Sequence, residues 1–305
     1  MDGILNVLKP PGMTSHDVVG FARRLFKVKR IGHTGTLDPG VAGVLILCVG
    51  KATRLVEYIL ETGKAYRSEL TLGITTDTQD SFGTVIHKKE KFFLDYSLIE
   101  KTLKEFEGKI RQIPPMYSAV RHQGKKLYEL ARAGEEVERQ EREVEIKSLR
   151  LLGYQDNLEQ GLVFGSKIIF EVECTKGTYI RTLCADIGER LGCGAHMSYL
   201  VRNQVGKFLL ESAWTLEELT NLTDLQQALQ SSSADLIGLP EIIVNPEGEK
   251  NLLHGRTITL EHIVDINNSN QQLDRKDFAV SNQNRDLIAI VREKRDYWQP
   301  VKVLC

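Results

Sequence analysis

The densest group of chemically capable residues is one short run, Gly32-His-Thr-Gly-Thr-Leu-Asp-Pro-Gly40. It places a carboxylate, Asp38, close to the imidazole of His33 and to two hydroxyls. Pro39 disfavours the α conformation for Asp38, so the carboxylate can project from a rigid turn into a cleft. Covalent catalysis at a sugar or a base requires a fixed carboxylate of this kind. Residue chemistry alone leaves open a structural turn, in which Asp38 accepts backbone N–H hydrogen bonds.

A phosphate-binding loop is a second kind of site to consider, because the run Gly43 to Thr53 contains Gly50-Lys-Ala. The spacing is wrong for such a loop, since six residues separate the two glycines. Ala52 also follows the lysine where Ser or Thr is required. No nucleotide cofactor is therefore expected.

A metal centre is a third kind of site, and its candidates are the cysteines. The chain has five, at irregular spacing, which is typical of reduced intracellular thiols rather than of a disulfide framework. Cys184, Cys193 and His196 come closest to a metal cluster, but they lack a fourth ligand and the paired spacing of zinc sites. We expect neither a metal nor an organic cofactor.

Local patterns predict the elements around Asp38. Thr14-Ser-His-Asp17 resembles a helix N-cap, and the apolar residues that follow recur at helical spacing, which predicts a basic amphipathic helix over 16–27. Residues 32–40 are expected to form a glycine-punctuated loop. This loop would lead into a continuous apolar run at 41–49, which predicts a buried strand.

Tyr66 lies in a stretch of alternating pattern, residues 64–73. The alternation predicts a strand whose inward face carries Tyr66, Ser68, Leu70 and Leu72. Similar patterns predict strands at 143–152 and 167–174 and helices near 97–107 and 179–191. Strands and helices do not alternate regularly, so we expect an α+β fold with a mixed, largely antiparallel central sheet flanked by helices.

The domain organisation follows from length and from turn-forming residues. A chain of 305 residues suggests a large domain plus a smaller one. The stretch 231–250 has the turn chemistry of a connecting region, which predicts a catalytic domain over 1–240. Strand-like runs at 287–291 and 301–304 then predict a small β-rich C-terminal domain over 241–305.

Composition and charge bound the class of protein. Hydrophobic residues make up 41% and charged residues 27%, as in soluble globular proteins, and no apolar run or leader predicts membrane insertion or export. A cytoplasmic location is expected. The net charge of −1 conceals an asymmetry, because residues 211–250 carry −7 and the rest +6.

Two stretches hold most of the excess positive charge. Five bases crowd residues 23–30, and within 109–132 six bases face only Glu129. Such clusters could neutralise the phosphates of a nucleic acid, although solvated helix faces give the same pattern. The stretch 111–134 also interleaves bases with aromatic residues, as RNA-contacting elements do. We expect a segment of about 111–142 to clasp RNA.

The ordered series of motifs resembles the tRNA pseudouridine-55 synthases, the TruB-type pseudouridine synthase family. Its main motif is the Gly-His-x-Gly-Thr-Leu-Asp-Pro string that ends at Pro39. The other matching segments are Lys9-Pro-Pro-Gly-Met-Thr-Ser15, Gly50-Lys-Ala-Thr-Arg54, Lys64-Ala-Tyr-Arg67, Thr76-Asp-Thr-Gln-Asp80, Pro114-Pro-Met-Tyr-Ser-Ala-Val120 and Lys176-Gly-Thr-Tyr-Ile-Arg-Thr182. The resemblance implies a pseudouridine synthase fold with a C-terminal PUA-like RNA-binding domain.

The resemblance also implies an activity and its catalytic residues. The enzyme would be an isomerase, an intramolecular transferase that converts the uridine at tRNA position 55 to pseudouridine. Asp38 would attack or assist at the sugar of a flipped uridine, and Tyr66 would stack on the base and take part in removing the C5 proton. Arg181 would pair with Asp38, orient it and keep it ionised.

Further residues would bind the substrate. The resemblance gives His33 a part in flipping the base, makes Leu200 a wall of the base pocket and puts Lys9 near the active site. Tyr179, Lys125 and Lys126 complete the expected substrate-binding set. We expect a monomer that binds the T-arm stem-loop of tRNA, without a membrane or a nucleotide cofactor.

Two other functions compete with this hypothesis. A non-catalytic RNA-binding protein would need the pocket but not the carboxylate, and the presence of Asp38, Tyr66 and Arg181 together argues against it. A glycosidase would need a second carboxylate at a defined separation from Asp38, and no partner stands out in the sequence.

Overall fold

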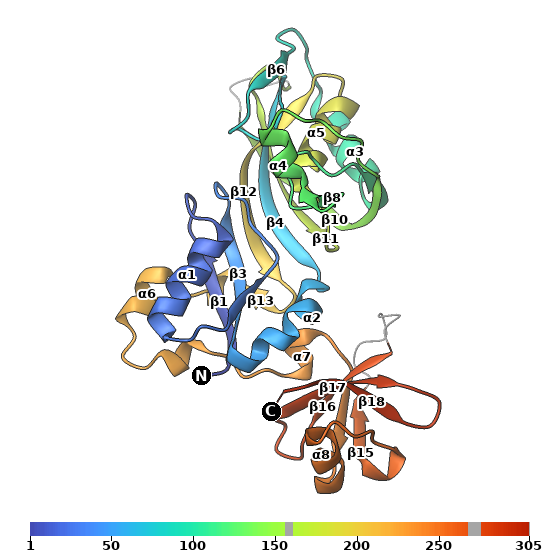
Figure 1. Cartoon of the computed structure of the whole chain (residues 1–305). Coiled ribbons are helices and arrows are strands. Elements are labelled where there is room, and N and C mark those ends of the chain that lie inside the picture. Colours follow the sequence, from blue (N-terminus) through green and yellow to red (C-terminus); the bar gives the residue numbers. More distant parts are fainter. Residues whose placement is uncertain (156–160, 268–275, 305) are drawn as a thin grey trace. The chain divides into compact units, whose positions relative to one another are not determined.

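The computed structural model describes residues 1–155, 161–267 and 276–304. The chain forms two compact units (Figure 1). Unit 1 comprises residues 1–62 and 204–305, and unit 2 comprises residues 63–203. The sequence-based division at residue 240 falls inside unit 1 and stays a prediction.

The N-terminal part of unit 1 is built on two long antiparallel strands. Strand β1 (Gly3–Lys9) pairs with β3 (Ala42–Val49) from Gly3 opposite Val49 to Lys9 opposite Gly43. The predicted strand at 41–49 is therefore confirmed. Strand β13 (Phe208–Leu209) pairs with the end of β12 (Ala195–Val205).

The predicted loop at 32–40 is wrong at its start, because β2 (Ile31–Thr34) is a strand. Gly32 lies opposite Cys48 and His33 opposite Leu47 of β3. The pairing with β3 makes this segment a strand, and pairing with another segment is not visible in the local pattern of a short glycine-containing run. The loop proper begins at Gly35, whose φ of 82° is the left-handed conformation that glycine adopts without strain.

Helix α1 (Ser15–Phe26) begins at the predicted place. The Thr14 hydroxyl accepts a hydrogen bond from the Asp17 N–H at 3.1 Å, and the Asp17 carboxylate accepts one from the Thr14 N–H at 2.8 Å. This reciprocal capping satisfies donors that the first turn leaves without partners. The buried face of α1, including Val18, Ala22 and Phe26, packs on β1 and β3. The helix therefore anchors the segment that precedes the Asp38 loop.

The helices of unit 1 that follow α1 and precede residue 240 are short. They are η1 (Gly50–Leu55), α2 (Val56–Leu60), η2 (Leu210–Ser212), α6 (Leu216–Asn221), η3 (Leu225–Ala228) and α7 (Ala234–Ile237). Tyr58 and Ile59 of α2 share a core with Ile237 of α7 and with the apolar residues Ala279 and Ile290 of the C-terminal sheet.

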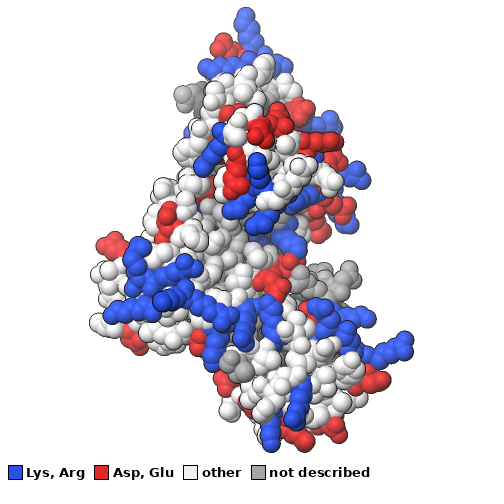
Figure 2. All heavy atoms as spheres, in the orientation of Figure 1, with Lys and Arg blue, Asp and Glu red and all other residues white. Residues whose placement is uncertain are grey.

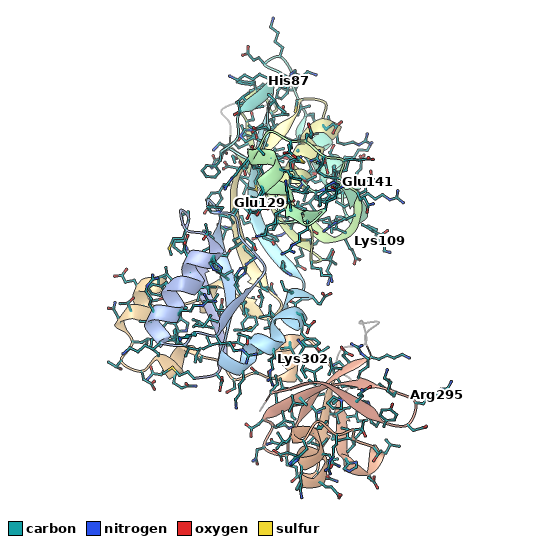
Figure 3. All side chains as sticks on the ribbon, viewed as in Figure 1. His87, Lys109, Glu129, Glu141, Arg295 and Lys302 are labelled. Atoms are coloured by element: carbon teal, nitrogen blue, oxygen red, sulfur yellow. The ribbon has the colours of Figure 1, made fainter. Side chains whose placement is uncertain are left out.

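The C-terminal part of unit 1 is a five-stranded sheet, which confirms the predicted β-rich end. The strand order is β15-β14-β16-β17-β18, and within this sheet the β14–β16 pair is parallel whereas the β14–β15, β16–β17 and β17–β18 pairs are antiparallel. The elements are β14 (Glu241–Val244), α8 (Pro246–Leu253), η4 (Leu260–His262), β15 (Ile263–Asn267), β16 (Asp277–Ser281), β17 (Leu287–Glu293) and β18 (Trp298–Val303). Lys302, labelled in Figure 3, forms an ion pair with Glu57 of α2.

The predicted connecting region at 231–250 is too long, because β14 and the start of α8 lie within it. In this stretch some of the turn-forming residues begin a helix instead of forming a linker. Asn245 caps α8 by accepting a hydrogen bond from the Gly248 N–H at 2.9 Å, and Pro246 occupies the first helical turn. Proline and a polar cap mark a helix start as readily as a linker.

Unit 2 is built on a largely antiparallel sheet with the strand order β12-β4-β11-β10-β7. Its strands are β4 (Lys64–Leu72), β7 (Gly108–Gln112), β10 (Arg142–Gln155), β11 (Lys167–Cys174) and most of β12. Its helices are α3 (Tyr96–Glu105), α4 (Leu127–Arg132) and α5 (Ile180–Arg190). Two small hairpins complete it, β5 (Ile74–Thr76) with β6 (Val85–Lys88) and β8 (Arg121–His122) with β9 (Lys125–Lys126).

The expected pattern of β4 is confirmed. Tyr66, Ser68, Leu70 and Leu72 are buried, whereas Arg67 between them is exposed. The strands predicted at 143–152 and 167–174 and the helices predicted near 97–107 and 179–191 are present as β10, β11, α3 and α5. Among the described residues, no helix is long and apolar enough to cross a membrane.

Candidate active site

The loop that carries Asp38 is held by hydrogen bonds to the residues on both sides of Asp38. Before it, the Ser15 hydroxyl at the start of α1 accepts a hydrogen bond from the Leu37 N–H at 2.9 Å and donates one to the Leu37 carbonyl at 3.2 Å. After it, the Pro39 carbonyl accepts a hydrogen bond from the Gly12 N–H at 2.8 Å. Asp38 itself is half-buried. The carboxylate therefore projects from a loop whose backbone is held in one place.

Lys9 also holds the loop that carries Asp38, through hydrogen bonds from its side chain. Its side chain is completely buried, at 0% exposure, at the end of β1. Its ammonium group donates hydrogen bonds to the carbonyls of Pro10 at 2.9 Å, Met13 at 2.6 Å and Pro39 at 3.2 Å. A lysine ammonium group carries only donors, and carbonyl oxygens are suitable acceptors for it. Lys9 thus connects the 10–13 segment to the residue that follows Asp38.

His33 is half-buried on β2 and belongs to unit 1, as Lys9 and Asp38 do. Its place in the strand comes from the pairing with Leu47 of β3. Strand pairing on one side and the Gly35 turn on the other fix where the Asp38 loop begins. The structure therefore brings three of the residues selected from sequence into one part of unit 1.

In unit 2, Tyr66 and Leu200 lie on neighbouring strands, β4 and β12. Each is buried to 8% exposure. Leu200 shares its strand face with Arg202, because side chains two residues apart point to the same side of a strand. Val201 and Asn203, which point the other way, are half-buried.

Arg202 is a residue that sequence reasoning missed as a site candidate. Its exposure is 1%, and it is one of the largest fully buried side chains of the described part of the chain. Burial lowers the pKa of its guanidinium, while a hydrogen bond with Tyr66 and the charge interaction between the two side chains act in the opposite direction. An inward position two residues after Leu200 on a strand was the signal that could have identified it.

Arg181 lies in the first turn of α5, as expected, and is buried. Its guanidinium donates hydrogen bonds to the Thr78 carbonyl at 3.1 Å and the Tyr117 carbonyl at 2.8 Å. It also lies 3.5 Å from the carboxylate of Asp80. The arginine therefore joins two of the sequence motifs, Thr76–Asp80 and Pro114–Val120, to the start of α5.

Asp80 is a second residue without a predicted role. One of its carboxylate oxygens accepts hydrogen bonds from the Thr78 hydroxyl at 2.6 Å and the Phe82 N–H at 3.0 Å, and the other faces Arg181. Gln79 beside it has a φ of 62°, a conformation that is uncommon for residues other than glycine. Strained backbone of this kind is concentrated at functional sites.

Tyr179 precedes α5 and is held by its backbone. Its N–H donates to the Gln112 side-chain oxygen at 3.0 Å, and its carbonyl accepts from the Gln112 amide group at 3.3 Å. Lys125 and Lys126 lie on β9, with Lys125 exposed and Lys126 half-buried. Lys126 and Arg132 both lie over the ring of Tyr128, at 5.4 and 5.5 Å from its centroid.

The expectation that the bases of the 109–132 stretch face only Glu129 does not hold for Lys109 and Arg111. Lys109 pairs with Glu143 at 2.9 Å and Arg111 with Glu141 at 3.7 Å, because β10 runs antiparallel to β7 and sets acids beside these bases. Figure 3 labels Lys109 on β7, Glu141 just before β10 and Glu129 on α4. The expected positive charge is therefore concentrated in residues 121–132.

Unit 1 carries the other group of bases. Arg23, Arg24, Lys27, Lys29 and Arg30 are all exposed at and after the end of α1. Figure 2 shows Lys and Arg side chains gathered over this part of unit 1. The expected basic clusters thus lie on the surface, where phosphates could reach them.

No group of three metal-ligating side chains occurs in the described residues. In place of a cluster, the His196 ring nitrogen Nδ1 lies 3.0 Å from the Ile74 carbonyl, and Cys184 lies 3.6 Å from the Ser68 hydroxyl. Cys48, Cys174, Cys184 and Cys193 are free and buried, and Cys305 lies outside the described residues.

Two family models match adjacent parts of the chain. The model of the TruB family pseudouridylate synthase N-terminal domain matches residues 23–180, and that of the tRNA pseudouridylate synthase B C-terminal domain matches residues 181–240. Between them they include all the candidate residues except Lys9.

Curated relatives match most of the chain. The tRNA pseudouridine synthase B of Symbiobacterium thermophilum is 50% identical over 257 residues, which cover 84% of this chain and 82% of the relative. That of Pelotomaculum thermopropionicum is 48% identical over 261 residues, covering 84% and 80% respectively.

Among solved structures, a Cbf5-Nop10-Gar1 complex contains a chain that is similar to this one with a TM-score of 0.76 and 27% sequence identity, covering 99% of this chain and 85% of that one. An H/ACA RNP bound to a substrate RNA containing 2′-deoxyuridine contains another, with a TM-score of 0.75 and 25% identity, covering the same shares.

Proposed function

The chain belongs to the TruB family of pseudouridylate synthases, and from this we propose that it is a tRNA pseudouridine synthase that isomerises the uridine at position 55, in the T loop. The observation that carries the proposal is the high identity to proteins named tRNA pseudouridine synthase B over more than four fifths of the chain. The fastened Asp38 loop supports the same activity, because it supplies a carboxylate in a fixed position.

The reaction breaks the bond between N1 of uracil and C1′ of the ribose and forms a bond between C5 and C1′. A proton leaves C5 and N1 gains one, so the product is an isomer of the substrate. Asp38 attacks or assists at the sugar when the first bond breaks. The freed base must turn within a closed pocket, where the rejoining step is faster than escape.

The roles of the other catalytic residues are part of the proposal and rest on the family motifs. Tyr66 stacks on the uracil and takes part in removing the C5 proton. Arg181 pairs with Asp38 and keeps it ionised. The buried contacts of Arg181 with the Thr78 and Tyr117 carbonyls support this role, because they hold the guanidinium in one orientation.

The substrate must be opened before it can react, since a uridine in a folded loop is stacked. In the proposal His33 takes part in flipping the base, Leu200 packs against it and Tyr179 lines the pocket. Lys125 and Lys126 contact the phosphates of the T-arm stem-loop. Lys9 acts by holding the Asp38 loop. The protein acts as a cytoplasmic monomer.

The test is to incubate the purified protein with an unmodified tRNA transcript and with a matched transcript that has cytidine at position 55. Chemical mapping of pseudouridine should find product at position 55 of the first transcript and none in the second. Absence of pseudouridine in the first transcript would overturn the proposed function. Release of free uracil would instead identify a glycosidase.

A further inference from the structure

We propose that Arg202 is a positioning residue of the reaction, which holds the hydroxyl of Tyr66 and thereby fixes the tyrosine ring on the face of β4. This inference rests on the proposed function. It adds a residue of β12 that none of the motifs recognised in the sequence singled out.

The first observation is the complete burial of a charged side chain. Arg202 is exposed to 1%, and Tyr66, its partner on the neighbouring strand, to 8%. Moving a guanidinium out of water is costly unless hydrogen bonds compensate. Leu200, two residues earlier on the same face, shows that the interior beside β4 accepts an apolar side chain. An arginine buried at position 202 therefore needs polar partners, and Tyr66 is one of them.

The second observation is the hydrogen bond between the two side chains. A guanidinium carries only donors, so the tyrosine oxygen must be the acceptor. The hydroxyl proton of Tyr66 then points away from Arg202. One bond thus fixes both the position of the ring and the direction in which its O–H group can donate.

Both effects matter because the uracil must rotate after its N1–C1′ bond breaks and before the C5–C1′ bond forms. Stacking requires a ring that does not tilt, and proton removal at C5 requires a hydroxyl oxygen at a fixed place. A hydrogen bond from a charged donor is roughly twice as strong as a neutral one and is not weakened by water at a buried site. Arg202 acts through Tyr66 and is not itself placed against the substrate.

The experiment is a double-mutant cycle in the full-length protein with Arg202→Met, Tyr66→Phe and the double variant. The readouts are the single-turnover rate of pseudouridine formation at saturating tRNA transcript, the Kd for the same transcript and the thermal unfolding temperature. Arg202→Lys tests rescue by a conservative donor. Arg67→Met is the matched control, because Arg67 lies on the same strand as Tyr66 but on its exposed face.

We expect Arg202→Met to lower the single-turnover rate about 10-fold to 100-fold, as the loss of a hydrogen bond with a charged group predicts. The Kd should change less than about twofold, and Arg202→Lys should recover part of the rate. In the Tyr66→Phe background, Arg202→Met should have almost no further effect, because the acceptor is already missing. Arg67→Met should react at the wild-type rate.

Two results would overturn the inference. One is a double variant whose rate loss equals the product of the two single losses. The other is an Arg202→Met protein that reacts at the wild-type rate, or that differs only in unfolding temperature and Kd. If Arg202→Met does not fold, the cycle with Arg202→Lys and Tyr66→Phe decides by the same criterion. A wild-type protein that forms no pseudouridine would refute the proposed function instead.

Discussion

Lys9 shows how a single residue can serve a site by acting on the backbone. Its side chain has no exposure to water, and the ammonium group donates hydrogen bonds to the carbonyls of residues 10, 13 and 39. The last of these carbonyls belongs to the residue directly after Asp38. A buried cation that is fully hydrogen-bonded stabilises one arrangement of the segments it joins, because any other would leave the charge without acceptors.

We predict that Lys9→Met lowers both stability and turnover. The substitution keeps most of the buried volume but leaves three carbonyls without their donor, which should cost about 1–3 kcal/mol for a buried group. The looser loop should also lower the single-turnover rate on tRNA. Thermal unfolding and rate measurements check this, with Lys51→Met as a control at an exposed lysine. An unchanged unfolding temperature would show that the three hydrogen bonds do not hold the loop.

At the scale of residues, the sequence identified the groups that belong to recognisable strings and missed those defined by their partners. Asp38, Tyr66 and Arg181 lie in motifs whose order along the chain indicates the family. Arg202 can be assigned a role only from its contact with Tyr66, which is more than a hundred residues away. Asp80 ends one of the recognised strings, but its ion pair with Arg181 is visible only in the fold. Such pairs form only when the chain folds, so no local sequence pattern predicts them.

The hairpin and helix at residues 121–132 place two lysine side chains close together on the protein. Strands β8 and β9 set Lys125 and Lys126 at the start of α4, and the Glu129 carboxylate accepts a hydrogen bond from the Lys126 N–H at 3.0 Å. That contact holds the beginning of the helix and lowers the pKa of Glu129. The lysine side chains are presented at one end of the element, as a phosphate-contacting surface requires.

We predict that Lys125→Ala combined with Lys126→Ala weakens tRNA binding and leaves the chemistry of bound RNA intact. Each lost phosphate contact should reduce the slope of log K against log salt by about one. Binding measured over a range of salt concentrations checks this, and single-turnover rates at saturating RNA should stay near the wild-type value. The matched control is Lys109→Ala, whose ammonium pairs with Glu143. Equal weakening by control and test variants would contradict the assignment.

Elements with long, regular patterns could be predicted, and short ones could not. The amphipathic repeat of α1, the apolar run of β3 and the alternation of β4 indicated their types correctly. Strand β2 has four residues, and its pairing with β3 determines it more than its own sequence does. In the same way, the turn-forming character of Asn245 and Pro246 predicts a linker, although these residues begin α8.

At the scale of the whole molecule, the four cysteines of the described residues are buried, and this makes stability depend on pH. Burial raises the pKa of Cys48 and of Cys184 to about 12, and that of Cys174 to about 11. A thiol of the unfolded chain has an ordinary pKa near 8.5. The folded state therefore holds protons that the unfolded state releases, and this contribution to stability is complete below about pH 8.5 and is lost as the pH rises toward 11 or 12.

We predict that these three cysteines resist alkylation in the native protein at pH 8 and react after denaturation, since only the thiolate is nucleophilic. Peptide mapping by mass spectrometry after brief treatment with iodoacetamide gives the result for each cysteine separately. The unfolding temperature should also fall between pH 8.5 and 10.5, and less so in a Cys184→Ala variant. Native labelling of Cys48 at the rate seen in denaturant would contradict the burial.

Asp38 is the carboxylate on which the proposed reaction depends most. The most direct measurement is the single-turnover rate of pseudouridine formation by Asp38→Asn on an unmodified tRNA transcript, with Kd measured on the same transcript. Asp2→Asn is the control, because it removes a carboxylate from the same unit outside the loop. We predict that Asp38→Asn binds the transcript within about twofold of the wild type and reacts more than about a thousandfold more slowly. Pseudouridine formation by Asp38→Asn at the wild-type rate would contradict the central claim.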